Sequence, residues 1–305
     1  MSEVNYRLAK EGDIPSISRV FSEAHDDLFR KRGFLDKPPT NPLPPPPIFA
    51  FLMRKTPSSF WIAEKEDDGE IVGFSHSFVR GSFWFFSFLF ISPAFQGRNI
   101  GTNLLERTLA SWKDVQITNR ATITFAFNPS SQFLYMKYGM YPREPVYYAE
   151  GPSKTIVENI QGLHKVEFEE VKNPRQGESI FREIDESVLG FSLDWHHEYF
   201  FETRSRCYVF KDKGNTLGYA YVSPTGRVGP VAVASNKLAR PVLESALELA
   251  ASQGVEKVWY WMPGSNIDAA ELALRNKMRL DPFVFMCTKP FAKWDSYIFS
   301  SAALM

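Results

Sequence analysis

Cysteine is scarce in this chain, whose 305 residues contain only Cys207 and Cys287. Both lie in apolar stretches typical of strands, so we expect buried free thiols and a reducing cytoplasm rather than a disulfide framework. Net charge is also lacking, because 35 Lys and Arg residues balance 35 Asp and Glu residues. Without a basic excess we expect no broad electrostatic surface for nucleic acid.

Long hydrophobic runs are missing as well. No apolar run reaches the roughly 18 residues that a membrane helix needs, and the beginning of the chain does not resemble a signal peptide. His196 and His197 are adjacent, so on a helix their side chains would point about 100° apart and could not share a metal ion. The sequence therefore predicts no membrane partner and no metal site.

What the chain does contain is a mixed pattern of strands and helices, and its order occurs twice. The elements expected in the first half are a strand at 4–8, a helix from 13, strands at 60–64, 71–79 and 84–91, a helix at 100–112, a strand at 121–127, a helix at 130–138 and a strand at 146–149. The second half repeats this order between 165 and 288. We expect an α+β fold of two tandem domains, 1–151 and 163–305, joined by a linker helix at 152–162.

One turn is the most informative segment of the first half. A strand ending at Ile91 passes through Gly97 into a helix that begins at Ile100. The unpaired amides at such a helix N-terminus favour an anionic phosphate. The glycine and lysine patterns of the Walker and dinucleotide loops are both absent from this turn.

The turn resembles the acyl-CoA loop of the GNAT acetyltransferases, Arg/Gln-x-x-Gly-x-Gly/Ala. The matching positions are Gln96, Gly97, Arg98, Ile100 and Gly101. Asn99 stands where the first motif glycine is expected, and Asn tolerates a positive φ better than most residues. The resemblance implies that the loop from Gln96 to Thr102 wraps the pyrophosphate of acetyl-CoA. It also implies that the backbone amides of Leu89, Phe90 and Ile91 hold the pantetheine arm and the thioester carbonyl.

A second segment resembles the same family through Asn128, Leu134, Tyr135, Lys137 and Gly139. The resemblance implies that Asn128 and Tyr135 contact the cofactor. It also implies that the Tyr135 phenol protonates the leaving thiolate. A packing role for Tyr135 is the alternative.

The general base cannot be identified from the sequence, because the strand at 83–91 carries no acid. The candidates are His76, on the preceding strand, and four residues near the end of the first helix: Glu23, His25, Asp26 and Asp27. A relay of water molecules is the alternative.

The acceptor is equally open. Trp61, Phe83, Trp84 and Phe86 suggest a partly apolar acceptor, or simply a core. The segment 37–47, with seven prolines, is either a spacer or a rigid lip over the acceptor site.

The second half lacks the loop motif, since residues 229–237 contain no such pattern. We therefore expect a degenerate second domain. The resemblance implies an acetyl-CoA-dependent N-acetyltransferase that acts on the primary amine of a small molecule, as a monomer or homodimer. The alternative function is a CoA-binding regulatory protein whose catalysis has lapsed.

Overall fold

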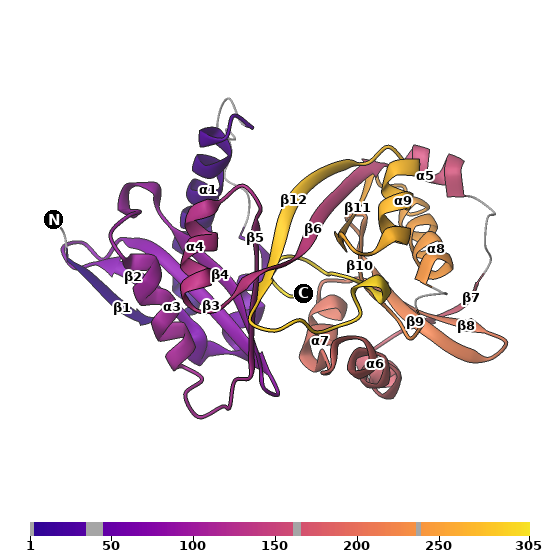
Figure 1. Ribbon diagram of the computed structural model, residues 1–305, viewed down its shortest axis with the longest axis horizontal. Coiled ribbons are helices and arrows are strands. Elements are labelled where there is room, and N and C mark those ends of the chain that lie inside the picture. The colour runs from indigo at the N-terminus through magenta and orange to yellow at the C-terminus, as the bar shows by residue number, and fades with distance from the viewer. Residues whose placement is uncertain (1–2, 35–44, 161–165, 236–238) are drawn as a thin grey trace. The chain divides into compact units, whose positions relative to one another are not determined.

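The computed structural model describes residues 3–34, 45–160, 166–235 and 239–305 (Figure 1). It divides into two compact units, Met1–Ala121 and Thr122–Met305. Most of the proline-rich segment 37–47 lies outside the described residues. Within the described part of the chain, no helix is both long and apolar enough to cross a membrane.

The first unit is built on an antiparallel sheet with the strand order β1-β2-β3-β4. Its elements are β1 (Val4–Leu8), α1 (Ile14–Lys31), α2 (Pro47–Lys55), β2 (Phe60–Lys65), β3 (Ile71–Arg80), β4 (Phe83–Ile91) and α3 (Ile100–Ala110). Helix α3 packs on β2 and β3 through Leu104, whereas α1 packs on β3 and β4. Side chains alternate along a strand, so Leu89 and Ile91 face α3 while Phe90 faces α1.

The second unit has the strand order β5-β12-β6-β11-β10-β9-β8-β7, and β13 pairs with β10. Strand β5 (Asn119–Phe125) begins at the boundary between the units. The elements that follow are α4 (Pro129–Lys137), β6 (Tyr141–Pro152), α5 (Ser153–Ile160), β7 (Glu167–Val171), α6 (Pro174–Leu189), α7 (Asp194–Glu202), β8 (Arg206–Asp212), β9 (Asn215–Val222), β10 (Arg227–Val233), α8 (Ala239–Ala251), β11 (Lys257–Pro263), α9 (Ile267–Arg275), β12 (Arg279–Cys287) and β13 (Tyr297–Ile298). Mixed strands flanked by helices confirm the expected α+β fold.

Helices α4 and α9 end in the same backbone geometry. Gly139 has φ +80° and Lys277 has φ +50°. The next amide bonds back to Tyr135 in one helix and to Ala273 in the other, at 3.1 and 2.9 Å. The strand–helix–strand arrangement of α4 is thus repeated around α9, as the sequence pattern predicts.

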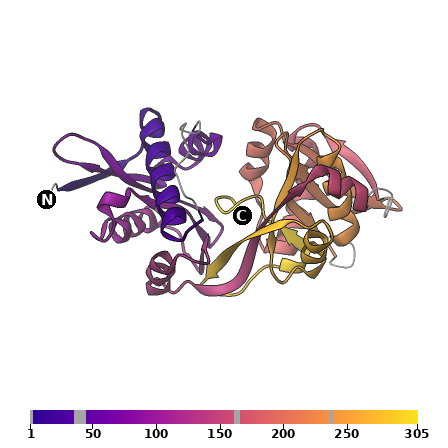
Figure 2. The same cartoon turned by 90° about the horizontal axis from the view of Figure 1, so that it is seen from above.

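Two long strands, β6 and β12, lie side by side (Figure 1, Figure 2). Strand β6 ends the first sequence repeat, yet its other neighbour is β11 of the second repeat. Strand β12 ends the second repeat and lies next to β5. The compact units therefore follow strand pairing, and we propose the division 1–151, 152–162 and 163–305 as the boundaries of the repeats.

Strand β6 is also longer than expected, because Pro142 and Pro145 interrupt its hydrophobic pattern. Pairing with β12 and β11 extends it over residues 141–152. Helix α7 and strand β13 were not expected from the sequence. Their short apolar stretches have no clear period of their own.

Candidate functional site

The end of β4 directs two of its backbone amides away from β3. The amide of Ser92 donates to the carbonyl of Val72 at 2.8 Å. Residues in an antiparallel ladder alternate in direction, so Phe90 bonds toward β3 in the same way. Leu89 and Ile91 turn their N–H and C=O groups toward the opposite edge. Of the three predicted amides, two therefore point away from β3.

The loop after β4 turns sharply at two residues. Gly97 has φ +77° and Asn99 has φ +60°. The predicted left-handed conformation of Asn99 is confirmed. A β-branched residue would be strained there, whereas Asn or Gly is tolerated.

Asn99 is also the N-cap residue of α3, but its side chain does not cap the helix. Its carbonyl accepts the Asn103 amide at 3.0 Å, which begins the helical ladder. The amides of Ile100, Gly101 and Thr102 belong to the first turn and have no carbonyl within the helix to bond. With the positive end of the helix dipole, they suit a phosphate group.

Side chains of the loop fix its path and add a positive charge. Gln96 Nε2 donates to the carbonyl of Ile91 at 3.1 Å, which ties the loop to the outward edge of β4. The exposed Arg98 guanidinium lies 4.9 Å from the centre of the Phe95 ring and donates to the Ala94 carbonyl. The loop thus presents one cation beside the first turn of α3.

The other predicted cofactor residues lie in the second unit, on α4. Asn128 is the N-cap of this helix, and its side-chain oxygen accepts the Ser131 amide at 3.4 Å. Tyr135 is only 5% exposed. Burial raises the pKa of its phenol, while a hydrogen bond with Thr122 lowers it, and burial is the larger effect.

His76 is an unsuitable general base. It is fully buried, and its Nε2 lies 2.7 Å from Thr56 Oγ1. Burial lowers the pKa of His76 to about 3, so the imidazole is neutral and weakly basic.

Among the acids of α1, Glu23 is the one that contacts the end of β4. The Ser92 hydroxyl donates to Glu23 at 3.2 Å, and Arg19 pairs with the same carboxylate group at 2.9 Å. Asp27 pairs with Lys31 at 2.7 Å near the end of the helix. The structure therefore favours Glu23 among the candidates on α1.

The aromatic residues singled out in the sequence belong to the core. Phe83, Trp84 and Phe86 are buried, and the Trp61 indole donates to Ser111.

A different aromatic row is half-exposed. Phe90 of β4 contacts Phe21, with ring centres 4.7 Å apart, and the row continues along α1 through His25 to Phe29. Phe34, 58% exposed, extends it. The spacing of four residues on α1 was the sequence signal that could have revealed this row.

In the second half, the segment 229–237 is described only up to residue 235. His197 of α7 is buried, with Nε2 3.0 Å from Asp185 and Nδ1 2.9 Å from Tyr221. Both ring nitrogens of the buried imidazole therefore have polar partners within this half.

Solved structures with the same fold cover nearly the whole chain. A putative acetyltransferase from Pyrococcus horikoshii has a TM-score of 0.75 at 21% identity, covering 99% of this chain and 96% of its own. A GCN5-related N-acetyltransferase from Sphaerobacter thermophilus has a TM-score of 0.62 at 16% identity, covering 96% and 98%. The glucosamine N-acetyltransferase region of a fungal multi-domain GH3 β-N-acetylglucosaminidase has a TM-score of 0.64 at 14% identity, covering 94% and 38%.

No curated protein matches the chain. The model of the acetyltransferase (GNAT) family matches residues 21–140, which include β4, the loop, α3 and α4. Members of this family transfer acyl groups from acyl-CoA. Residues 21–140 therefore match a GNAT acetyltransferase domain, and the solved structures share the fold over nearly the whole chain.

Proposed function

We propose that the chain is an acetyl-CoA-dependent N-acetyltransferase whose site lies in the first half and whose acceptor is the primary amine of a small molecule. The observation that carries the proposal is the junction of β4 and α3. There, outward amides, two left-handed residues and an uncapped helix N-terminus follow one another within 14 residues, 89–102. This order supplies donors for a thioester carbonyl, a pantetheine arm and a pyrophosphate in turn.

In the proposed reaction, the neutral amine attacks the carbonyl carbon of the thioester. A C–N bond forms, the C–S bond breaks, and the acyl oxygen is stabilised by an amide of β4, from Leu89 or Ile91. The amine proton passes to Glu23, directly or through water. Tyr135 gives its proton to the leaving thiolate and recovers one from solvent.

The raised pKa of Tyr135 is compatible with this role. A phenol that stays protonated at neutral pH is a proton donor throughout the approach of the substrates. Its weaker acidity means that the proton moves only as negative charge develops on sulfur.

The half-exposed aromatic row supports an acceptor with an apolar or flat part. It begins at Phe90, between the two outward amides in sequence, and runs along one face of α1, whereas Glu23 lies on another face of this helix. An ammonium group near aromatic faces is favoured electrostatically. The similarity to a glucosamine N-acetyltransferase region adds an example of a small primary amine as acceptor.

The alternative is a protein that binds CoA but has lost catalysis. Two features favour it: Asn99 replaces a motif glycine, and β4 carries no acidic side chain.

The test combines calorimetry with acetyl-CoA and thiol release across a panel of amines. We expect one acetyl-CoA per chain and turnover with at least one amine. Gly101→Asp should reduce binding at least 100-fold, because a carboxylate would occupy the place of the phosphate. Gly12→Asp is the control, since this glycine has open space around it in the same unit. Binding without thiol release would support the lapsed protein, and normal binding by Gly101→Asp would refute the site.

A further inference from the structure

Strand β13 has no counterpart among the described residues of the first half. Its two residues pair with β10: Ile298 lies opposite Val231, and Tyr297 lies opposite Ala232. The next residue continues onto another strand, because the Phe299 amide donates to the Trp261 carbonyl of β11 at 2.9 Å. Residues 297–299 therefore bridge β10 and β11.

Strand β10 is the counterpart of β4, as their registers show. Gly73 of β3 lies opposite Ile91 at the end of β4. Gly218 of β9 lies opposite Val233 at the end of β10. The pairing becomes irregular a few residues earlier in both strands.

Two positions before these strand ends, Leu89 in β4 corresponds to Val231 in β10. The amide of Ala234 donates to Leu217 of β9 at 2.8 Å, so alternation turns the N–H and C=O of Val231 away from β9. They face Ile298 instead. Ile298 thus pairs with Val231. Val231 is the counterpart of Leu89, whose amide we assign to the acyl donor in the first half.

Asn266 adds a second, independent correspondence. Like Asn128, it is the N-cap of its helix, and its side-chain oxygen accepts the Ala269 amide at 3.0 Å. Its Nδ2 donates to the carbonyl of Tyr297 at 3.3 Å and to that of Trp294 at 3.4 Å. The residue that corresponds to a predicted cofactor ligand therefore binds the backbone of this segment.

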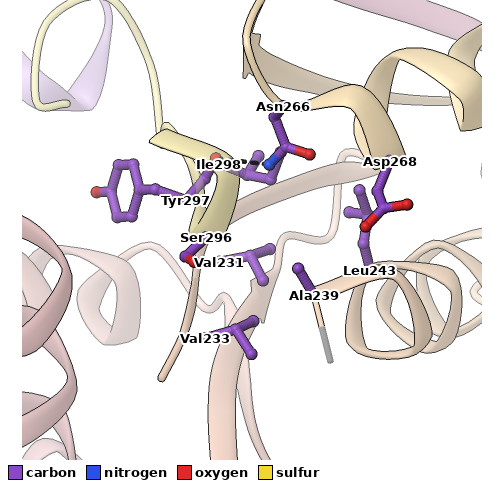
Figure 3. A pocket seen from close by; sticks show the side chains of 9 residues that line it. All are labelled: Val231, Val233, Ala239, Leu243, Asn266, Asp268, Ser296, Tyr297 and Ile298. Atoms are coloured by element: carbon purple, nitrogen blue, oxygen red, sulfur yellow. Dashed lines mark hydrogen bonds between the residues drawn. The ribbon is translucent and has the colours of Figure 1, made fainter. Parts of the chain in front are cut away.

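All three residues of the segment, Tyr297, Ile298 and Phe299, are buried. A cavity of about 10 Å³, enough for no more than one water molecule, lies among described residues between β13 and the start of α8 (Figure 3).

The fit has one defect. The Tyr297 hydroxyl is buried and has no hydrogen-bond partner among the described residues. An unpaired buried hydroxyl destabilises the closed arrangement, so the segment is held less firmly than its burial suggests.

We propose that residues 297–299 occupy the acyl-donor cleft of the second half, along the edge of β10 that corresponds to the pantetheine-binding edge proposed for β4. The identity of the ligand, acyl-CoA, rests on the proposed function. The position of the cleft rests on the strand registers of β4 and β10. In the second half, residues 297–299 of the same chain thus close the position that acyl-CoA would take. One acyl-CoA site per chain follows from it.

The test is amide hydrogen exchange of the full chain, read at Val231. The Ala232 amide, which bonds toward β9, is the internal reference. We expect both amides to exchange slowly in the wild type. In Ile298→Pro, which removes the N–H donor, Val231 should exchange at least tenfold faster while Ala232 stays slow. Ile298→Ala keeps the N–H and is the matched control.

Asn266→Asp is the second variant, needed if the proline variant does not fold. It keeps an oxygen for the helix cap but removes the donor to Tyr297, and it should accelerate exchange at Val231 in the same way. Adding millimolar S-acetyl-pantetheine to either opened variant should restore slow exchange at Val231, with no effect on the wild type.

Fast exchange of Val231 in the wild type would overturn the proposal. So would opened variants whose Val231 amide never responds to the thioester. Failure of the proposed function would give a different result: the exchange rates of the Leu89 and Ile91 amides would not change when acetyl-CoA is added to the wild type.

Discussion

Asn128 and Asn266 cap equivalent helices with the same atom. The side-chain oxygen of each accepts the amide three residues later, at 3.4 Å in α4 and 3.0 Å in α9. In Asn266 the amide nitrogen is then used to bind the backbone of Tyr297. We propose that the same nitrogen of Asn128 donates a hydrogen bond to the cofactor.

Asn128→Asp separates these two roles, because Asp caps a helix as well as Asn but cannot donate. We expect nearly unchanged thermal stability and an affinity for acetyl-CoA about 3- to 10-fold lower, the value of roughly one hydrogen bond. Asn128→Ala should lose both affinity and about 1 kcal/mol of stability. If the Asp variant binds acetyl-CoA normally in calorimetry, Asn128 is a helix cap alone.

Asn99→Gly and Asn99→Val test the loop. The left-handed conformation suits Gly, so that variant should bind acetyl-CoA at least as tightly as the wild type. Val costs roughly 1–2 kcal/mol there, which predicts about 5- to 30-fold weaker binding. Equal dissociation constants for the two variants would contradict the role of this turn.

Tyr135→Phe tests the general acid while keeping the packing of the ring. We expect kcat to fall roughly 10- to 1,000-fold, with little change in the affinity for acetyl-CoA. Steady-state kinetics with the acceptor found in the amine panel gives the answer. Wild-type turnover by this variant would show that Tyr135 has only a packing role and that solvent supplies the proton.

Glu23→Gln tests the base. The amide keeps the size of the side chain and can still accept from Ser92, but it cannot take the amine proton. We expect kcat/KM to fall about 10- to 100-fold at neutral pH and to recover as pH rises, since more of the amine is then already neutral. Asp27→Asn, also on α1, should leave kcat/KM and its pH dependence unchanged. A Glu23→Gln profile parallel to that of the wild type would assign the proton to water.

His76 predicts a pH dependence of stability. Its pKa is about 3 in the folded protein and about 6.5 in an unfolded chain, so the unfolded state binds the extra proton as pH falls. Above about pH 6.5 His76 does not lower the free energy of unfolding. Below this pH the free energy of unfolding falls progressively, and the loss is about 2 kcal/mol at pH 5.

His76→Phe is the comparison, since it removes the titration from a site already lined by Phe60 and Phe78. Urea unfolding at pH 7 and pH 5 should show a smaller loss of stability for this variant than for the wild type. An equal loss in the two proteins would show that His76 is not held neutral by burial.

The order of strands and helices was predictable because it depends on patterns within a few residues. Strand β1 has the expected limits, and β2, β3 and β4 differ from theirs by one residue at an end. The positive φ of Asn99 was also predictable, because it depends on the chemistry of a single residue in a tight turn.

The sequence by itself thus determined most of the elements, the loop and the resemblance to one family. Only the tertiary structure decided which amides of β4 point outward, that His76 is buried, and that residues 297–299 lie between β10 and β11. These features depend on pairing between residues far apart in the chain, whose partners no local pattern specifies. A strand of two residues has no period of its own, and its position is fixed by the free edge that it covers.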